Sequence, residues 1–483
     1  MKRMKTKYFS WWLAGVLALT CSCSDWLDVN PRTEIKEKDI YTSEASFKNV
    51  MNGIYIQLAS KQLYGVNTSS YFTDLLAQLW TPASQSTESY VAAFNYTHKD
   101  VEPIISDIWN KYYTALAHVN NLLENLGTTQ VSFTYGNKEL LKGEAYGLRA
   151  FIHLEILRLF GPLPTEPESV IAIPYTTEMT KDPSKLVSKT YGEVQKLILQ
   201  DLDSAEVYLK NDPFALGNMF DFNHPGNVQC KYVPEDDWHY YRQTHFNRYA
   251  VDATRARFYQ WTGKPEAANI YAKRVLAVKN TDQTDKFTLT NEASYADSWS
   301  SNLVMQSEHL FAVNCSNHQD LISGVLTGSR PDLYSSKNNV NKIYENATDD
   351  IRNKAGRYWE FDGTTAYFLK YSGSGIIEPV NMIPLIRLSE MYLILIENLP
   401  IGEAATYFET YRQARGMSVN VTISETNRIS RLESECRKEF FGEGQMFFWY
   451  KRHNVLNYTV PVRFNVPANG YVVPKPKGQI AFE

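Results

Sequence analysis

Cysteine is scarce and widely spaced in this chain. Of five cysteines in 483 residues, Cys21 and Cys23 lie near the start. The remaining three are Cys230, Cys315 and Cys436. Thiols at this spacing match neither a disulfide framework nor the close pairs of a zinc site. The cysteines therefore predict neither a disulfide framework nor a zinc site.

Catalytic motifs are also missing. There is no Gly-x-Ser-x-Gly elbow and no His-Glu-x-x-His zinc helix. Residues 442–444 (Gly-Glu-Gly) lack the third glycine and the preceding strand of a dinucleotide-binding loop. Adjacent carboxylates such as Asp236-Asp237 and Asp349-Asp350 do not by themselves set a catalytic separation. We therefore predict a protein that is not an enzyme.

Long hydrophobic runs are absent, which excludes a membrane-spanning helix of roughly 20 residues. The apolar run 11–19 is too short to span, and four basic residues precede it. Cysteines follow it at a position where lipoproteins are cut and acylated. This order predicts a secretory signal over residues 1–22. Cys23, between Ser22 and Ser24, is the expected lipidation site, Cys21 is the second candidate, and an unlipidated signal peptide is the remaining alternative.

An excess of positive charge is missing as well. The net charge is −4, and removal of residues 1–22 lowers it by four units because that segment holds four basic and no acidic residues. A nucleic-acid partner requires a basic face for its phosphates. We expect no nucleic-acid partner.

Aromatic residues, in contrast, are abundant: 13% of the chain, with 32 Tyr and 10 Trp. Many fall on apolar stripes with helical spacing. Such stripes predict a mainly α-helical protein, with helices at about residues 43–58, 105–126, 141–159, 190–209, 248–261, 265–276, 386–396, 404–415 and 426–441. The pairs 248–261/265–276 and 386–396/404–415 resemble tetratricopeptide units. A short strand is expected at residues 309–313.

Long aromatic, Asn- and Ser-rich loops are expected at residues 62–100, 211–245, 314–340 and 355–382. Loops of this length without structure of their own are usually functional or disordered. The Pro-rich C-terminal tail should be extended. We expect residues 23–245 and 246–483 to form one globular unit.

Four motifs in order resemble the SusD/RagB family of outer-membrane nutrient-binding lipoproteins. They are residues 23–31 (CSDWLDVNP), 143–164 (GEAYGLRA…RLFGPLP), 387–393 (RLSEMYL) and 437–452 (RKEFFGEG…FWYKR). Trp449 and Met446 depart from the family pattern, at positions that belong to scaffold packing.

The resemblance implies a scaffold of tetratricopeptide-like helix pairs, with the ligand site on irregular loops. It also implies a surface-exposed protein, lipid-anchored in the outer membrane, that captures a glycan or a peptide for a TonB-dependent transporter of the SusC type. The family motifs carry no ligand residue of their own.

Ligand residues are instead expected among the loop aromatics and their polar neighbours, because a pyranose stacks its C–H face on a Trp or Tyr ring. Side-chain amides, carboxylates and guanidinium groups then bind the hydroxyls. The candidates are Asp74, Trp80, Tyr90, Asn95, Trp238, Tyr240, His318, Arg330, Tyr334 and Trp359.

Other readings stay open. Any single ring is more often packing than a ligand contact, above all Tyr71 and Tyr241, and Trp109, Trp261 and Trp449 lie on helical stripes or core motifs. Residues 211–227 could hold calcium through oxygen ligands. The first hypothesis is oligosaccharide capture, the second is peptide capture, and the third is a helical glycoside hydrolase, which requires two carboxylates across a cleft.

Overall fold

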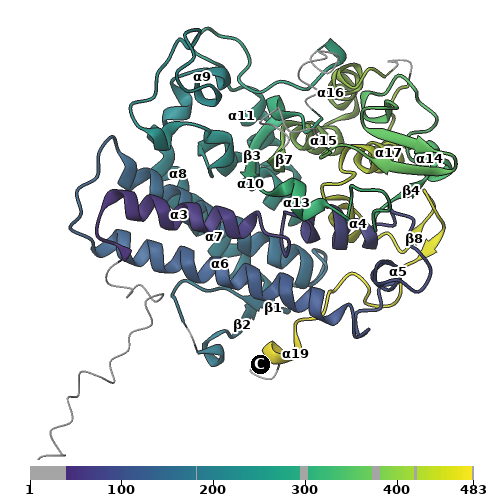
Figure 1. Cartoon of the computed structure of the whole chain (residues 1–483), viewed down its shortest axis with the longest axis horizontal. Coiled ribbons are helices and arrows are strands. Elements are labelled where there is room, and N and C mark those ends of the chain that lie inside the picture. Colours follow the sequence, from purple (N-terminus) through teal and green to yellow (C-terminus); the bar gives the residue numbers. More distant parts are fainter. Residues whose placement is uncertain (1–39, 181, 294–302, 373–380, 418–420, 481–483) are drawn as a thin grey trace, which may run out of the picture.

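The computed structural model describes residues 40–180, 182–293, 303–372, 381–417 and 421–480, and helices dominate it (Figure 1). Cys21 and Cys23 lie outside this range. The longer helices are α3 (Glu44–Leu58), α6 (Glu102–Thr128), α7 (Asn137–Phe160), α8 (Tyr191–Tyr208), α10 (Arg248–Trp261), α11 (Pro265–Leu276), α15 (Leu388–Asn398), α16 (Ile401–Ala414) and α17 (Arg428–Glu439). The mainly α-helical class is confirmed.

Local sequence fixes the ends of several helices. Ser43 and Ser46 form a reciprocal capping pair at the start of α3, and Thr190 and Glu193 form another at the start of α8. Helix α7 ends at Gly161, as the Gly-Pro step predicts. These ends agree with the sequence within a few residues.

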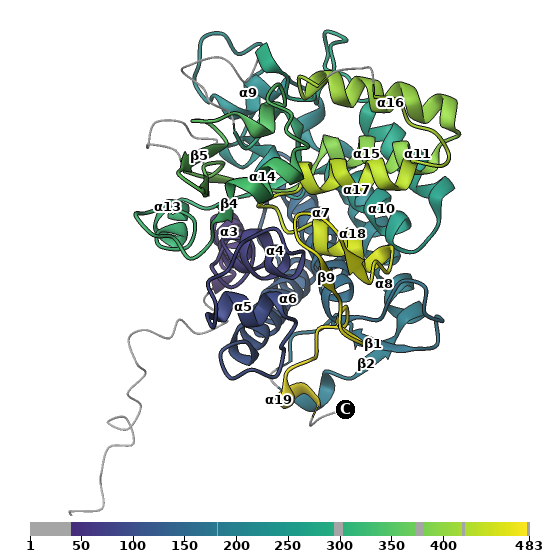
Figure 2. The ribbon, with the colours of Figure 1, turned by 90° about the vertical axis from the view of Figure 1, so that its right-hand side faces the viewer.

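The predicted helix pairs are present as α10/α11 and α15/α16. Gly263, with φ of +67°, makes the turn between α10 and α11. Helix α11 packs on α15, so the two pairs stack on each other. Figure 2 shows α10, α11, α15 and α16 on one side of the molecule and α5, α13 and β5 on the other. The tetratricopeptide-like scaffold is confirmed.

The predicted helix 386–396 begins later than expected. Residues before it form β7 (Met382–Arg387), which pairs antiparallel with β3 (His309–Asn314). The sequence predicts β3 but not its partner β7. Both faces of β7 are buried, so its apolar run lacks the alternation that identifies a strand. Because β7 occupies the residues up to Arg387, helix α15 begins at Leu388.

The four predicted loops contain more structure than expected. The shorter helices of the fold are α4 (Phe72–Leu76), α5 (Thr87–Ala92), α9 (Met219–Asn223), α13 (His318–Ile322), α14 (Lys337–Ile343), α18 (Met446–Arg452) and α19 (Lys477–Ile480). The remaining strands are β1 (Ile171–Pro174), β2 (Ser188–Thr190), β4 (Ser335–Ser336), β5 (Trp359–Asp362), β6 (Thr365–Phe368), β8 (Asn457–Tyr458) and β9 (Phe464–Asn465). Segments this short give too weak a period to recognise in sequence.

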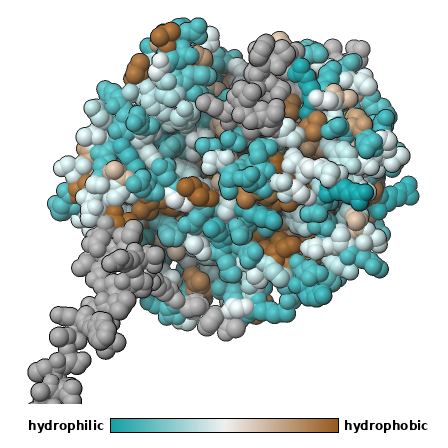
Figure 3. All heavy atoms as spheres, in the orientation of Figure 1, coloured by the Kyte–Doolittle hydropathy of each residue, from teal (hydrophilic) through white to brown (hydrophobic). Residues whose placement is uncertain are grey.

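A single cluster of buried apolar side chains runs from Phe47 to Val473 and involves both halves of the chain. Exposed apolar side chains form small separate patches among hydrophilic ones on the face in Figure 3. Among the described residues, none of the helices has the length and apolarity needed to cross a bilayer. The described cysteines, Cys230, Cys315 and Cys436, are free thiols.

Buried charge joins the C-terminal elements. The Glu439 carboxylate lies 2.8 Å from Arg352 Nη1, 2.5 Å from Arg387 Nη1 and 2.7 Å from Arg415 Nη2, and none of these side chains is more than 1% exposed. Burial alone would raise the pKa of Glu439, but the three guanidinium groups hold it well below its usual value. The arginine in the RLSEMYL motif and the glutamate in the last motif therefore serve the scaffold.

Candidate ligand-binding surface

Two tryptophans that were predicted as ligand contacts, Trp80 and Trp359, pack against the same ring inside the core. Trp80 is 3% exposed and Trp359 is fully buried. Both rings pack edge-on against Phe441, at centroid distances of 4.7 and 5.0 Å. The Trp80 indole N–H donates to the Ser70 carbonyl at 2.7 Å. Buried rings offer no face to a ligand from solvent in this conformation, so the structure corrects both predictions.

Asp74 and His318 are buried as well. The Asp74 carboxylate accepts hydrogen bonds from the backbone N–H groups of Gly442 and Gly444, at 2.7 and 3.1 Å. Gly444 has φ of +73°, and an added Cβ would lie 2.2 Å from the Thr68 carbonyl oxygen. Asp74 therefore fastens a tight glycine turn to α4. His318 is 2% exposed and packs edge-on against Tyr371. Both are scaffold contacts, which corrects their prediction as ligand residues.

The loop 211–245 packs against α7, through Trp238. Trp238 is 6% exposed, and its indole N–H donates to Glu144 on α7 at 3.2 Å. The Arg242 guanidinium also lies 2.5 Å from the Glu144 carboxylate. Burial alone would raise the pKa of Glu144, but this ion pair lowers it to about 2. Trp238 is thus part of a buried polar cluster, which corrects that prediction. Tyr240 is half-buried beside it and away from the other candidates.

The loops 62–100 and 314–340 do meet. The Thr81 backbone N–H donates to the Tyr334 carbonyl at 2.8 Å, and the Thr81 hydroxyl accepts from the Ser336 N–H at 3.1 Å. Asn339 also donates to this hydroxyl, at 3.2 Å. In Figures 1 and 2, α5 and β4 lie on the same side of the molecule. The candidate Tyr90 belongs to α5, and the candidate Tyr334 directly precedes β4.

Two carboxylates lie at this junction. The Tyr71 hydroxyl donates to Glu88 at 2.5 Å. Burial, followed by the charge of Glu88, raises the pKa of Asp332, so the two carboxylates repel each other. Burial and the same two carboxylates raise the pKa of Tyr71. The site thus carries hydrogen-bond acceptors beside the predicted aromatic rings.

Aromatic and amide groups complete the junction. Tyr90 stacks on His98 with ring centroids 3.7 Å apart, and both side chains are half-exposed. Asn95, between them in sequence, is exposed. Arg330 is exposed on the segment that leads to Asp332.

We call this set the loop-junction surface: Glu88, Tyr90, Asn95, His98, Arg330, Asp332 and Tyr334. Sequence reasoning named Tyr90, Asn95, Arg330 and Tyr334, and it missed Glu88, His98 and Asp332. The only available signal was that each missed residue lies within eight positions of a named one, in the same loop. The two joined loops together carry flat rings, donors and acceptors, which suit a polar ligand with apolar faces.

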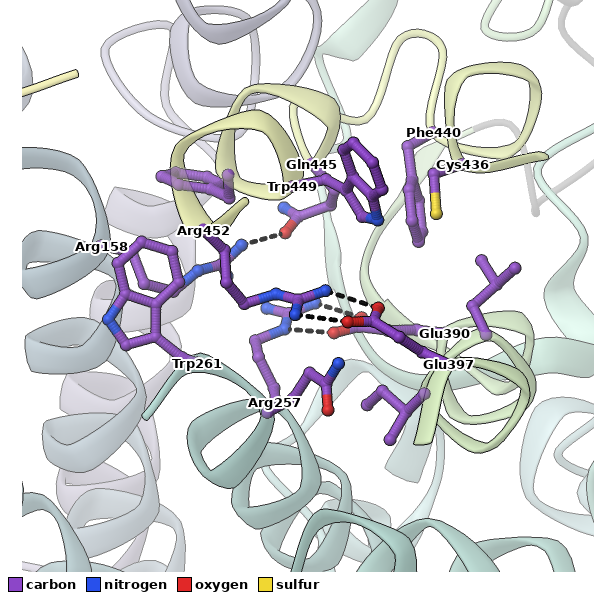
Figure 4. Close-up of a pocket in the computed structure, with 14 residues that line it drawn as sticks. Arg158, Arg257, Trp261, Glu390, Glu397, Cys436, Phe440, Gln445, Trp449 and Arg452 are labelled. Atoms are coloured by element: carbon purple, nitrogen blue, oxygen red, sulfur yellow. Dashed lines mark hydrogen bonds and ion pairs between the residues drawn. The ribbon is translucent and has the colours of Figure 1, made fainter. Parts of the chain in front are cut away.

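A separate small cavity of about 70 Å³ lies among α7, α10, α15, α17 and α18 (Figure 4). Arg257 reaches Glu390 at 2.6 Å, and Arg452 reaches Glu397 at 2.6 Å. Trp261 and Trp449 line the cavity and are buried, as the packing reading of these rings predicts. Such a volume holds a few waters rather than a sugar ring, so we assign this cavity to the scaffold.

Within the described residues, no group of three or more His, Cys, Asp and Glu side chains could hold a metal ion. In the stretch 211–227, Asp212 instead pairs with Arg242 at 2.9 Å, and Asp221 caps α9. The carboxylates of Asp212 and Asp221 are thus engaged in local structure.

Comparison with known proteins agrees with this architecture. A family model described as "Starch-binding associating with outer membrane" matches residues 25–219. SusD-like protein P2 of Formosa agariphila is 25% identical over 206 residues, which are 41% of this chain and 38% of that protein. The alignment thus spans well under half of this relative.

Solved structures extend the likeness over the chain. A SusD superfamily protein from Bacteroides thetaiotaomicron superposes with a TM-score of 0.71 at 19% identity, covering 91% of this chain and 98% of that one. A laminarin-binding SusD-like protein superposes with a TM-score of 0.61 at 15% identity, covering 91% and 98%.

The fold and its helix pairs define a SusD-type scaffold with a loop-borne surface. The family model, the curated relative and the superposed structures agree: residues 25–219 are similar to SusD-like proteins in sequence, and the fold over most of the chain is that of SusD superfamily structures.

Proposed function

We propose that this protein is a non-catalytic cell-surface lipoprotein that binds an oligosaccharide at the loop-junction surface and delivers it to a TonB-dependent transporter. The observation that carries the proposal is the hydrogen bonding at Thr81, which joins two aromatic loops from distant sequence. The match of residues 25–219 to the starch-binding family model and the laminarin-binding neighbour support a saccharide ligand.

The roles of the individual groups follow from their chemistry. The Tyr90–His98 stack presents a flat, polarisable surface to a pyranose face. Glu88 and Asp332 accept hydrogen bonds from sugar hydroxyls, and Arg330 and Asn95 donate them. A neutral ligand that donates to both carboxylates also relieves their mutual repulsion.

Delivery and anchoring rest on the sequence. An acylated Cys23 would tether the chain to the outer membrane and keep the folded part outside the cell. The transporter partner would be of the SusC type, as the family resemblance implies. Peptide capture is the alternative ligand class.

The test is calorimetric titration of the purified protein with laminari-, malto-, cello- and xylohexaose and with short peptides. We expect Tyr90→Ala and Asp332→Asn each to weaken saccharide binding about tenfold, since one stacking contact or one charged hydrogen bond contributes about 1–2 kcal/mol. Trp80→Phe is the matched control, because that ring is buried, and it should leave the affinity unchanged.

Three outcomes contradict the proposal. Peptide binding without saccharide binding would move the ligand class to peptides. Saccharide binding that is insensitive to Tyr90→Ala and Asp332→Asn would place the site elsewhere. Hydrolysis of any hexaose, lost in Glu88→Gln and Asp332→Asn, would make the carboxylate pair catalytic and revive the glycoside hydrolase hypothesis.

A further inference from the structure

The C-terminal segment 474–480, which we call the C-terminal strap, is tied across one end of the molecule. Lys477 Nζ lies 2.7 Å from Glu102 Oε1 on α6. On the other side, Lys475 Nζ donates to the Ser188 hydroxyl at 2.8 Å, and the Gln479 amide donates to the Leu186 carbonyl at 2.7 Å. Helix α19 of the strap lies below α6, beside β1 and β2 (Figure 1).

A groove of about 940 Å³ runs between α6 and the strap. This volume falls in the range of roughly 300–1,000 Å³ that is typical of small-molecule sites. None of the residues of the loop-junction surface lines the groove, although Tyr96 and Thr97 at its edge lie between Asn95 and His98 of that surface. We call this groove the α6 groove.

Helix α6 gives the groove two parallel rows of side chains. One row is apolar and aromatic, with Trp109 and Tyr113, whose ring centroids are 4.7 Å apart. Trp109 is 3% exposed and packs edge-on against Phe160, so it supports Tyr113 and offers no face of its own to a ligand. Tyr113 is half-buried, and its hydroxyl donates to the Pro174 carbonyl at 2.9 Å, which holds this ring in place.

The other row is polar and advances one turn at a time: Ser106, Asn110, Thr114 and His118. Residues four apart on a helix are separated by about 6 Å along its axis. This repeat is comparable to the length of one pyranose unit, so a saccharide chain lying along α6 meets a polar side chain at each sugar.

The lining carries little net charge. Glu102 and Lys477 neutralise each other, and the Lys475 ammonium donates to the Ser188 hydroxyl. Burial, and then the nearby Lys111, lowers the pKa of His118, which favours its uncharged ring. Thr176 and Thr180 add hydroxyls to the lining. Hydroxyl and amide groups beside the Tyr113 ring match the hydroxyls and a C–H face of a sugar.

We propose that the α6 groove is a second binding site, for a chain of neutral hexoses, and that the C-terminal strap closes one of its sides. A SusD-type protein with two separate sites holds a longer glycan at two points. Two-point attachment raises the overall affinity for a polymer above that of either site, without any new contact.

The test measures hexaose binding to the purified full chain at both sites. In the Tyr90→Ala background the loop-junction surface should bind about tenfold more weakly, so titrations with laminari-, malto-, cello- and mannohexaose report chiefly the α6 groove. Asn110→Trp places an indole in the groove and should weaken the remaining binding at least tenfold. Asp107→Trp is the matched control, since Asp107 is exposed on the same helix outside the lining, and it should have no effect.

A second readout is hydrogen exchange. A bound hexaose should slow exchange in residues 102–118 and 176–180 of the wild-type chain and not of Asn110→Trp. Each of three results overturns the proposal: no hexaose binds in the Tyr90→Ala background, Asn110→Trp leaves that binding unchanged, or only peptides compete for the groove. If Tyr90→Ala by itself abolished hexaose binding, no binding would be left to assign to the α6 groove. That result would support the proposed function and remove the second site.

Discussion

At the scale of single residues, the environment rather than the residue type decides what an aromatic or acidic side chain does. Trp80 and Asp74 lie in a loop of the kind that binds ligands, yet both are buried and hydrogen-bonded to backbone. Glu88 and Asp332, which carry no motif, lie at the loop junction, where the charge of Glu88 helps to raise the pKa of Asp332. A loop sequence supplies candidates, but only long-range packing separates those that point outward from those that fasten the loop.

Lys286 gives a residue-scale prediction about pH. Its ammonium is 3% exposed, lies 4.6 Å from the centre of the Phe214 ring and donates to the Gly217 carbonyl. Burial lowers the pKa of Lys286 to about 8 from an ordinary value of 10.5. Between these values the unfolded chain binds the proton and the folded chain does not, so stability rises with pH.

We expect the free energy of unfolding of the wild-type chain to gain up to about 3 kcal/mol from this group between pH 8 and 10.5. The Lys286→Met variant should lack that gain. Denaturant titrations at several pH values measure the difference, with the exposed Lys231→Met as control. Parallel pH curves for the wild type and Lys286→Met would show that Lys286 keeps an ordinary pKa.

At the scale of elements, helix ends with side-chain caps offer the sharpest test. The Thr190 hydroxyl accepts from the Glu193 N–H, and Glu193 accepts from the Thr190 N–H at 2.8 Å. We expect Thr190→Ala to lower the free energy of unfolding by about 1 kcal/mol. Ser204→Ala, an exposed change within the same helix, should cost less than half as much. Equal effects on the denaturation midpoint would mean that the cap contributes nothing.

The helices could be predicted because each carries its own periodic stripe, and α8 even carries its own cap. Strand β7 could not be predicted in this way. Its run of apolar residues is compatible with a helix, and only pairing with β3, about 70 residues earlier in the chain, makes it a strand. The short helices α5 and α13 also depend on tertiary contacts. The same dependence explains why the sequence indicated the two loops of the candidate surface but not their meeting at Thr81.

At the scale of the whole molecule, the decisive prediction is attachment. If Cys23 is acylated, then Cys23→Ala should move the protein from the membrane fraction to the soluble fraction, because the described part of the chain has no helix able to span a bilayer. Cys21→Ala is the control and should remain membrane-bound. Metabolic labelling with a fatty acid measures the modification directly, and continued labelling of Cys23→Ala would assign the anchor to another residue.

The carboxylate of Glu439, shared by Arg352, Arg387 and Arg415, has a consequence for how such sequences can diverge. Loss of any one partner leaves a buried charge unpaired and lowers the free energy of unfolding by about 3–5 kcal/mol. This is a large part of the stability of most proteins. A substitution at one of these four positions alone should therefore destabilise the fold. Exposed loop positions such as Asn95 and Arg330 carry no such buried charge, so changes there can alter ligand binding while the frame stays the same.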